Sequence, residues 1–198
     1  MRSLVRLAAL AAALSLAACV GAPAPRERFF TLGSPEAGAP PASAAPSIFV
    51  GRVSIPAAVD RTEMVLSTGA NQVDISDDDR WAEPLRDAIP RVIAQDLSRD
   101  LGTSRVLSSR AAAGTPVDFR VSIEVQRFDS SLADGATVDA LWTVTPARGG
   151  ARDGRTLAHE TNAAHDPGAL AAAHSRALAR VASDIANAIR AMETSQRR

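Results

Sequence analysis

Three consecutive aspartates, Asp77–Asp79, are the first candidates for chemistry, because neighbouring carboxylates can bind a divalent cation or act as acid and base. A magnesium or calcium loop favours carboxylates at alternate positions, whereas three in a row point in different directions. Carboxylates also stabilise a helix start, where they accept from free N–H groups and face the positive end of the dipole. Pro84, tolerated only near a first turn, places that start close by. The stretch therefore predicts a helix start, ahead of a partner surface or a metal site.

The three histidines, His159, His165 and His174, form no metal motif that we recognise. Residues 159–163 read HETNA, which lacks the second histidine of the H-E-x-x-H zinc motif. His174 falls in the apolar stripe of the last predicted helix, where a packed histidine is expected. We therefore expect no metal and no other cofactor.

The sequence contains no motif of a known enzyme class. G-x-S-x-G and G-x-G-x-x-G are absent, and a P-loop needs a lysine, of which the chain has none. A serine, a histidine and a carboxylate could still converge in the folded chain, since spacing alone does not show a triad. We expect a protein that is not an enzyme, with a periplasmic hydrolase as the alternative.

Composition indicates a globular protein without a nucleic-acid partner. Of the 198 residues, 46% are apolar, which is enough for a core. The formal net charge is zero, and without Arg2 and Arg6 of the leader the acidic residues outnumber the basic ones by two. A nucleic-acid binder would need a basic stripe.

The N-terminus has the pattern of an export signal. A short basic head, residues 1–6, precedes an apolar run, residues 7–18, that is too short to span a bilayer. Cys19 follows, and the segment Leu16–Cys19 resembles the bacterial lipobox. The resemblance implies a signal peptide at residues 1–18 and a lipid, palmitate among its acyl chains, on Cys19. An ordinary secreted protein with a chance cysteine is the alternative.

Two further features concern the anchor. Cys19 is the only cysteine, so no intramolecular disulfide can form. Val20 follows it where lipoproteins retained in the inner membrane carry aspartate, which by resemblance implies the outer membrane, facing the periplasm.

Residues 19–47 are predicted to be a lipidated tether rich in Ala and Pro, because such composition buries too little apolar surface to fold. A short apolar island, RFFTL at residues 28–32, interrupts it. The adjacent Phe29 and Phe30 predict a short strand that docks on the domain, with a wedge dipping into the membrane as the weaker alternative.

Residues 48–194 predict a single α+β domain, a two-layer sandwich of a mainly antiparallel sheet with two helices packed on one face. Apolar and polar residues alternate most regularly at 117–128 and 136–144. Further strands are expected at 48–55, 63–68, 71–76, 104–108 and 155–161.

The two helices are predicted from apolar residues at steps of three and four. The first runs to Leu101 with Gly102 as its stop, and Pro90 is expected to kink or split it. Asp166 and Pro167 predict the start of the second. Trp81 at the entry of the first helix either packs the core or meets a partner.

The order of these motifs resembles the PqiC-like family of ABC-type transport auxiliary lipoproteins. The resemblance covers roughly residues 16–145, and the last helix stands in the expected place. The matching positions are Phe29, Phe30, Leu32, Pro56, Arg61, Val65, Trp81, Pro84, Leu85 and Phe128.

This resemblance implies a non-catalytic outer-membrane subunit of a lipid transport system driven by an ABC ATPase. The implied partner is an MCE-domain protein, and a homo-oligomer is left open. An assembly lipoprotein of another envelope machine, for secretion or polysaccharide export, is the alternative. Trp81, Phe29 and Phe30 are the hypothesised partner-binding residues, because interface energy concentrates in aromatic and Arg anchors.

Overall fold

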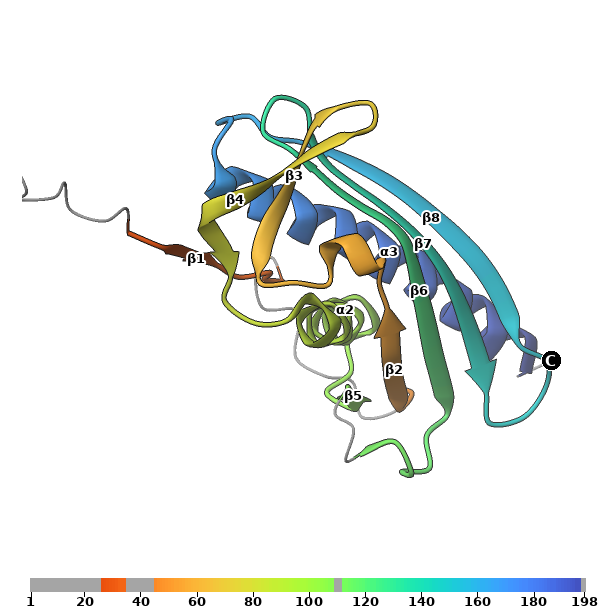
Figure 1. Cartoon of the computed structure of the whole chain (residues 1–198). Coiled ribbons are helices and arrows are strands. Elements are labelled where there is room, and N and C mark those ends of the chain that lie inside the picture. Colours follow the sequence, from red (N-terminus) through yellow and green to blue (C-terminus); the bar gives the residue numbers. More distant parts are fainter. Residues whose placement is uncertain (1–25, 35–44, 109–111, 197–198) are drawn as a thin grey trace, which may run out of the picture.

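A computed structural model describes residues 26–34, 45–108 and 112–196, in which eight strands and two α-helices form one mixed sheet and a helical layer (Figure 1). The strands are β1 (Arg28–Phe30), β2 (Ile48–Ser54), β3 (Glu63–Gly69), β4 (Gln72–Trp81), β5 (Val106–Leu107), β6 (Phe119–Ser131), β7 (Gly135–Pro146) and β8 (Arg152–Thr161). The helices are the 3₁₀ turn η1 (Ala57–Val59), α2 (Leu85–Leu101) and α3 (Pro167–Gln196).

Strand β6 organises the sheet. One edge of β6 pairs antiparallel with β7 along almost its whole length, and β7 continues the meander to β8. The other edge is shared, because β2 pairs parallel with its first half and β3 meets it at Ser130. β3 and β4 form an antiparallel hairpin, and β1 adds to β4 in parallel. The longest pairings are antiparallel, so the predicted α+β class with a mainly antiparallel sheet is confirmed.

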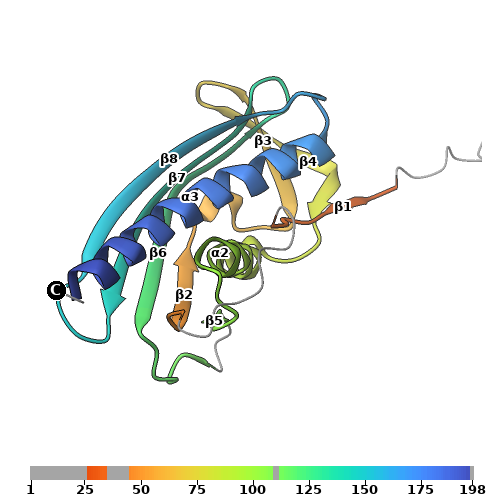
Figure 2. The same cartoon turned by 180° about the vertical axis from the view of Figure 1, so that it is seen from behind.

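The helices cover the face of the sheet on which the apolar residues alternate. Val121, Ile123 and Val125 of β6 and Val138 and Val144 of β7 are buried there. Helix α3 crosses β7 and β8, while α2, seen end-on in Figures 1 and 2, packs on β2 and against α3. The two layers thus enclose a single principal core.

The first helix ends at the residue that the sequence predicts. It ends at Gly102, whose φ of 60° is the left-handed geometry that glycine adopts readily. Pro90 was expected to kink or split the helix, and it does not split α2, which continues through this residue. A proline at this position removes the helical hydrogen bond to the carbonyl of Arg86, four residues earlier.

The helix start predicted at Asp77–Asp79 is also wrong, since all three residues belong to β4. The helix begins at Leu85 behind Pro84, with no side-chain cap. The Pro84 carbonyl accepts instead from the N–H groups of Asp87 and Ala88. The hairpin with β3 and the parallel pairing with β1 extend β4 to Trp81, and β1 lies far from β4 in the sequence.

The last helix begins as its cap predicts. The carboxylate of Asp166 accepts from the N–H of Ala169 at 2.8 Å, with Pro167 as the first helical residue. The stripe that includes Leu170, His174 and Leu178 is buried. Within the described part of the chain, no helix combines the length and the apolar character needed to cross a membrane.

Candidate functional site

The predicted partner-binding residues lie together where β1 joins β4. In this parallel pairing Phe29 stands beside Arg80, and Phe30 beside Trp81. The side chain of Phe29 is 60% exposed, whereas Phe30 packs partly against the core. The predicted lipid-attachment residue, Cys19, lies outside the described residues, as do the signal peptide and much of the tether.

Trp81 ends β4 and lies in the core, at 5% exposure. Its ring meets the edges of two buried neighbours, Phe128 at 6.1 Å and His174 at 5.9 Å between centroids. Trp81 thus packs in the core, which is the first of its two predicted roles. Phe29 is the exposed residue among the three predicted partner-binding residues.

The segment 28–34 is fastened to the domain by polar contacts along its length. Arg28 Nε donates to the buried carboxylate of Asp79 at 2.7 Å. Arg91 Nη2 donates to the carbonyl of Leu32 at 3.0 Å, and the N–H of Gly33 donates to Ser175 Oγ at 3.1 Å. With the side chain of Leu32 buried at 2% exposure, the chain that leads to Cys19 leaves the domain from a fixed point.

Asp96 completes this attachment and was missed at the level of sequence. It is fully buried on α2, and its Oδ1 accepts from Ser34 Oγ and from Arg99 Nη1, both at 2.6 Å. Burial raises the pKa of the Asp96 carboxyl, although Ser34 and Arg99 act in the opposite direction. The available signal was its spacing, because Asp96 stands four residues after Val92 and three after Ile93, two apolar residues of the buried stripe.

The histidines do not come together. Nδ1 of His159 is hydrogen-bonded to Thr137 Oγ1 at 3.0 Å, and Nδ1 of His165 lies 3.0 Å from the carbonyl oxygen of Leu132. His174 Nε2 lies 2.7 Å from Ser130 Oγ, but both residues are buried. Among residues 26–34, 45–108 and 112–196, no group of three or more His, Cys, Asp or Glu side chains is arranged to hold a metal ion.

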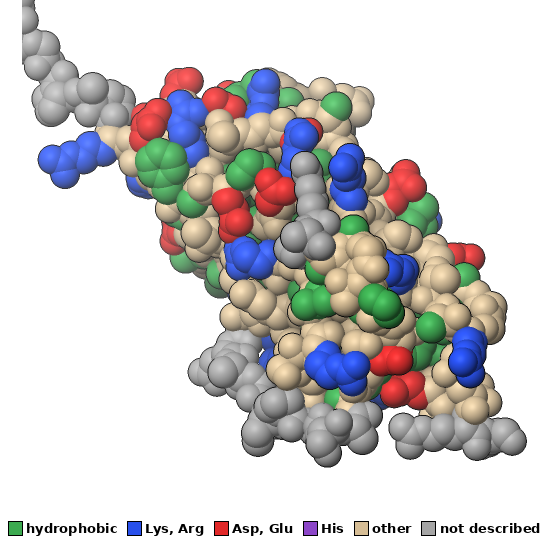
Figure 3. All heavy atoms as spheres, turned by 90° about the horizontal axis from the view of Figure 1, so that it is seen from below, with side chains coloured by type: hydrophobic (Ala, Val, Ile, Leu, Met, Phe, Trp, Pro, Cys, Tyr) green, Lys and Arg blue, Asp and Glu red, His purple; other side chains and the backbone are tan. Residues whose placement is uncertain are grey.

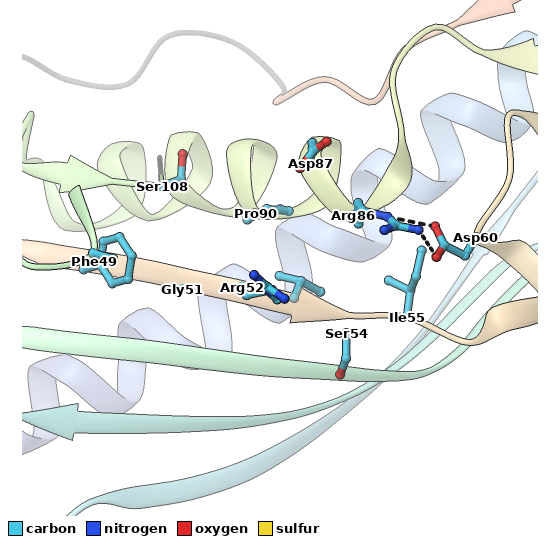
Figure 4. Close-up of a pocket in the computed structure, with 12 residues that line it drawn as sticks. Phe49, Gly51, Arg52, Ser54, Ile55, Asp60, Arg86, Asp87, Pro90 and Ser108 are labelled. Carbon is cyan, nitrogen blue, oxygen red and sulfur yellow. Dashed lines mark hydrogen bonds and ion pairs between the residues drawn. The ribbon is translucent and has the colours of Figure 1, made fainter. Parts of the chain in front are cut away.

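A groove of about 500 Å³ lies between β2 and α2 (Figure 4). Its walls come from β2, the turn after it, the first two turns of α2 and the segment that follows β5. The lining residues include Phe49, Arg52, Ile55, Asp60, Arg86 and Pro90. Arg86 and Asp60 point toward each other across one end and form a forked ion pair, with Nε to Oδ1 at 3.1 Å.

Charges of both signs are mixed on one face of the domain. On the face seen from below, acidic and basic side chains lie interspersed, with no large patch of one sign (Figure 3). Many are paired, such as Arg80 with Glu63 and Glu27, which raises the pKa of the Arg80 guanidinium. A backbone hydrogen bond and, after it, the bond from Arg80 lower the pKa of the Glu63 carboxyl. This distribution does not resemble the basic stripe of a nucleic-acid interface.

Solved structures share this fold, among them two that match most of this chain. A crystal structure of an uncharacterized protein matches with a TM-score of 0.67 at 15% identity and covers 83% of this chain and 99% of its own. A DUF330-family protein from Xanthomonas campestris matches with a TM-score of 0.62 at 17% identity and covers 85% of this chain and 99% of its own. No curated protein sequence matches the chain significantly.

The sequence of the domain matches one family over most of its length. Residues 30–186, from Phe30 of β1 into the last turns of α3, match the model of the ABC-type transport auxiliary lipoprotein component. The match includes the docked N-terminal segment from Phe30 onward, the whole sheet from β2 to β8, helix α2, and α3 as far as Ala186. The chain therefore belongs to the family of ABC-type transport auxiliary lipoproteins.

Proposed function

We propose that the protein is a non-catalytic subunit of an MCE-domain, ABC-type lipid transport system, anchored in the outer membrane by a lipid on Cys19. The observation that carries this proposal is the family match over residues 30–186. It supports a lipoprotein that assists an ABC transporter. The lipid cargo, the MCE partner and the outer membrane are our extension, based on the lipobox resemblance at Leu16–Cys19 and on Val20.

The docked segment supports a subunit that works close to its membrane. Because β1 and Leu32 are held on the domain, nine residues, 19–27, separate the proposed lipid from the folded part. A chain of this length spans at most about 30 Å when fully extended. A partner from the inner membrane would therefore have to cross most of the periplasm itself, as an elongated MCE assembly would.

Phe29 is the proposed partner contact. Its ring is exposed on β1, beside the ion pairs of Arg80, and large aromatic side chains contribute strongly to interfaces. Phe30 and Trp81 lie behind it in the same pairing, so we assign them the role of holding Phe29 in place. This arrangement would present one aromatic anchor at the end of the domain nearest the tether.

The test is co-purification of the MCE protein with tagged full-length protein from detergent-solubilised membranes. We expect wild type to retain the MCE protein and Phe29→Ala to lose most of it, with an unchanged melting temperature. Leu157→Ala is the matched control, since Leu157 is 62% exposed on β8 and should bind normally. Cys19→Ser should release the protein from the outer-membrane fraction or leave it unprocessed.

Each result has a defined consequence. If wild type retains no MCE protein in any detergent, the proposed partner is wrong. If the Phe29→Ala protein retains the MCE protein fully, Phe29 is not part of the interface, and the proposed partner still stands. A processed Cys19→Ser protein that stays in the outer membrane would contradict the lipid anchor.

A further inference from the structure

The edge of β2 beside the groove is unpaired over most of its length. β2 pairs with β6 on one side, and on the other side β5 meets only Ile48 and Phe49. Within the described ranges, no strand pairs with residues 50–54 on that side. An open strand edge presents unpaired N–H and C=O groups, which form a template for another extended chain. The groove lies along this open edge, so a segment bound there could pair with β2.

The walls of the groove suit the side chains of such a segment. The ring of Phe49, which is almost fully buried, the partly buried Ile55 and the ring of Pro90 supply apolar surface on both the β2 and the α2 side. Pro90 has no N–H, so the carbonyl of Arg86 four residues earlier lacks its helical donor, and both residues line the groove. A hydrocarbon chain could fill the apolar part but could not pair with these backbone groups.

The charge that the groove leaves unbalanced is positive. Arg52 is exposed, and in the described part of the chain it has no ion pair or hydrogen-bond partner. Arg86 is neutralised by Asp60. Asp87 lies at the rim and points away from β2, on the other side of α2 (Figure 4). A bound segment with a carboxylate opposite Arg52 would therefore be complementary in charge.

We infer that the groove binds an extended, acidic peptide segment of the transport partner, which adds as a strand to residues 50–54 of β2. The segment places a carboxylate against Arg52 and an apolar side chain between Phe49 and Pro90. Strand addition obtains its affinity from main-chain hydrogen bonds and its specificity from side-chain pockets. The groove volume is within the range of ligand sites. The inference rests on the proposed function only for the identity of the polypeptide.

The test is photo-crosslinking in cells, with the full-length protein and a photoreactive residue in place of Ser54, which lines the groove. We expect a crosslink to one continuous segment of another polypeptide that contains Asp or Glu, mapped by mass spectrometry. Arg52→Glu should lower the yield about tenfold or more, because it turns an attraction into a repulsion. Arg152→Glu is the matched control, an exposed arginine at the start of β8, and should leave the yield within about twofold.

Other outcomes overturn the inference. These are no crosslink from position 54, a crosslink to lipid, a crosslink to a second copy of this protein, or a yield that Arg52→Glu leaves unchanged. A melting temperature close to that of wild type shows that Arg52→Glu is folded. If the mapped segment belongs to a polypeptide outside any ABC transporter, the groove inference stands and the proposed function fails. If the MCE protein co-purifies but position 54 gives no crosslink, the proposed function stands and the groove inference fails.

Discussion

The imidazole of His174 stacks on the phenyl ring of Phe128, with ring centroids 3.9 Å apart and planes within 9° of parallel. Trp81 meets both rings edge-on, so residues from β4, β6 and α3 form one aromatic cluster in the core. His174 is fully buried, and its Nδ1 has no hydrogen-bond partner among the described residues. Burial therefore lowers the pKa of this imidazole to about 3.

The stability of the domain should decrease with acidification because of His174. Its folded pKa lies below its unfolded value, so the unfolded state binds more protons between about pH 6.5 and pH 3. The full contribution is present above pH 6.5, and it falls by up to about 1.4 kcal/mol per pH unit as the pH decreases through that window.

The comparison that isolates this effect is urea unfolding of wild type and His174→Gln at several pH values. Glutamine can still bond Ser130 but does not titrate in this range. Carboxylates with a lowered pKa, such as Asp118 and Asp139, act in the same direction in both proteins and cancel in the difference. A wild-type advantage that stayed constant from pH 7 to pH 4 would contradict the assignment.

Two of the three neighbouring aspartates, Asp79 and Asp77, should differ in their contribution to stability. The carboxylate of Asp79 is 7% exposed and accepts from Arg28 Nε at 2.7 Å and from Ser76 Oγ at 3.1 Å. Asp79→Asn should cost about 1–2 kcal/mol of unfolding free energy, because it removes a charge-assisted hydrogen bond. Asp77→Asn, on the exposed part of β4, should stay within about 0.5 kcal/mol. Chemical denaturation measures both, and equal effects would contradict this description of Asp79.

Gly154 should not tolerate a methyl group. A Cβ built on Gly154 would come within 2.2 Å of the ring of Trp142, which is held by its bond to Thr156 Oγ1. Gly154→Ala should therefore cost about 1–3 kcal/mol through overpacking. Gly150→Ala is the control, since a Cβ there meets nothing within 4 Å. Thermal melts of the two variants should separate clearly, and coinciding melts would mean that β8 moves away from Trp142 at little cost.

The N-terminal segment should contribute to the stability of the domain. Leu32 is 2% exposed in the core, so Leu32→Ala should cost about 2–5 kcal/mol through the lost contacts and the cavity. Phe29→Ala, three residues earlier and exposed, should change the stability by less than about 0.5 kcal/mol. Hydrogen exchange of residues 28–34 should rise in the first variant alone. Unchanged exchange there would show that Leu32 does not hold the segment.

Local pattern was sufficient for most of the secondary structure. The alternation around Val121 and Val138 predicts β6 and β7, the steps of three and four predict α2 and α3, and Gly102 and Asp166 mark a helix end and a helix start. Each of these features depends on residues within a few positions of one another, so the sequence alone contains the information. The family resemblance also followed from sequence, because it rests on the order of short motifs along the chain.

Contacts between distant residues decided the rest. Asp77–Asp79 satisfy the local rules for a helix start, but pairing with β1, in which Arg28 stands beside Asp79 across 51 positions of the sequence, continues the strand to Trp81. The sequence left open whether Trp81 is exposed, and contacts with Phe128 of β6 and His174 of α3 bury it. Asp96 accepts a hydrogen bond from Ser34, which lies 62 positions earlier in the sequence. The groove beside Arg52 exists because β5 stops after pairing with Phe49 and leaves the β2 edge open. Burial and strand pairing depend on which segments contact one another in space, and only the tertiary structure shows those contacts.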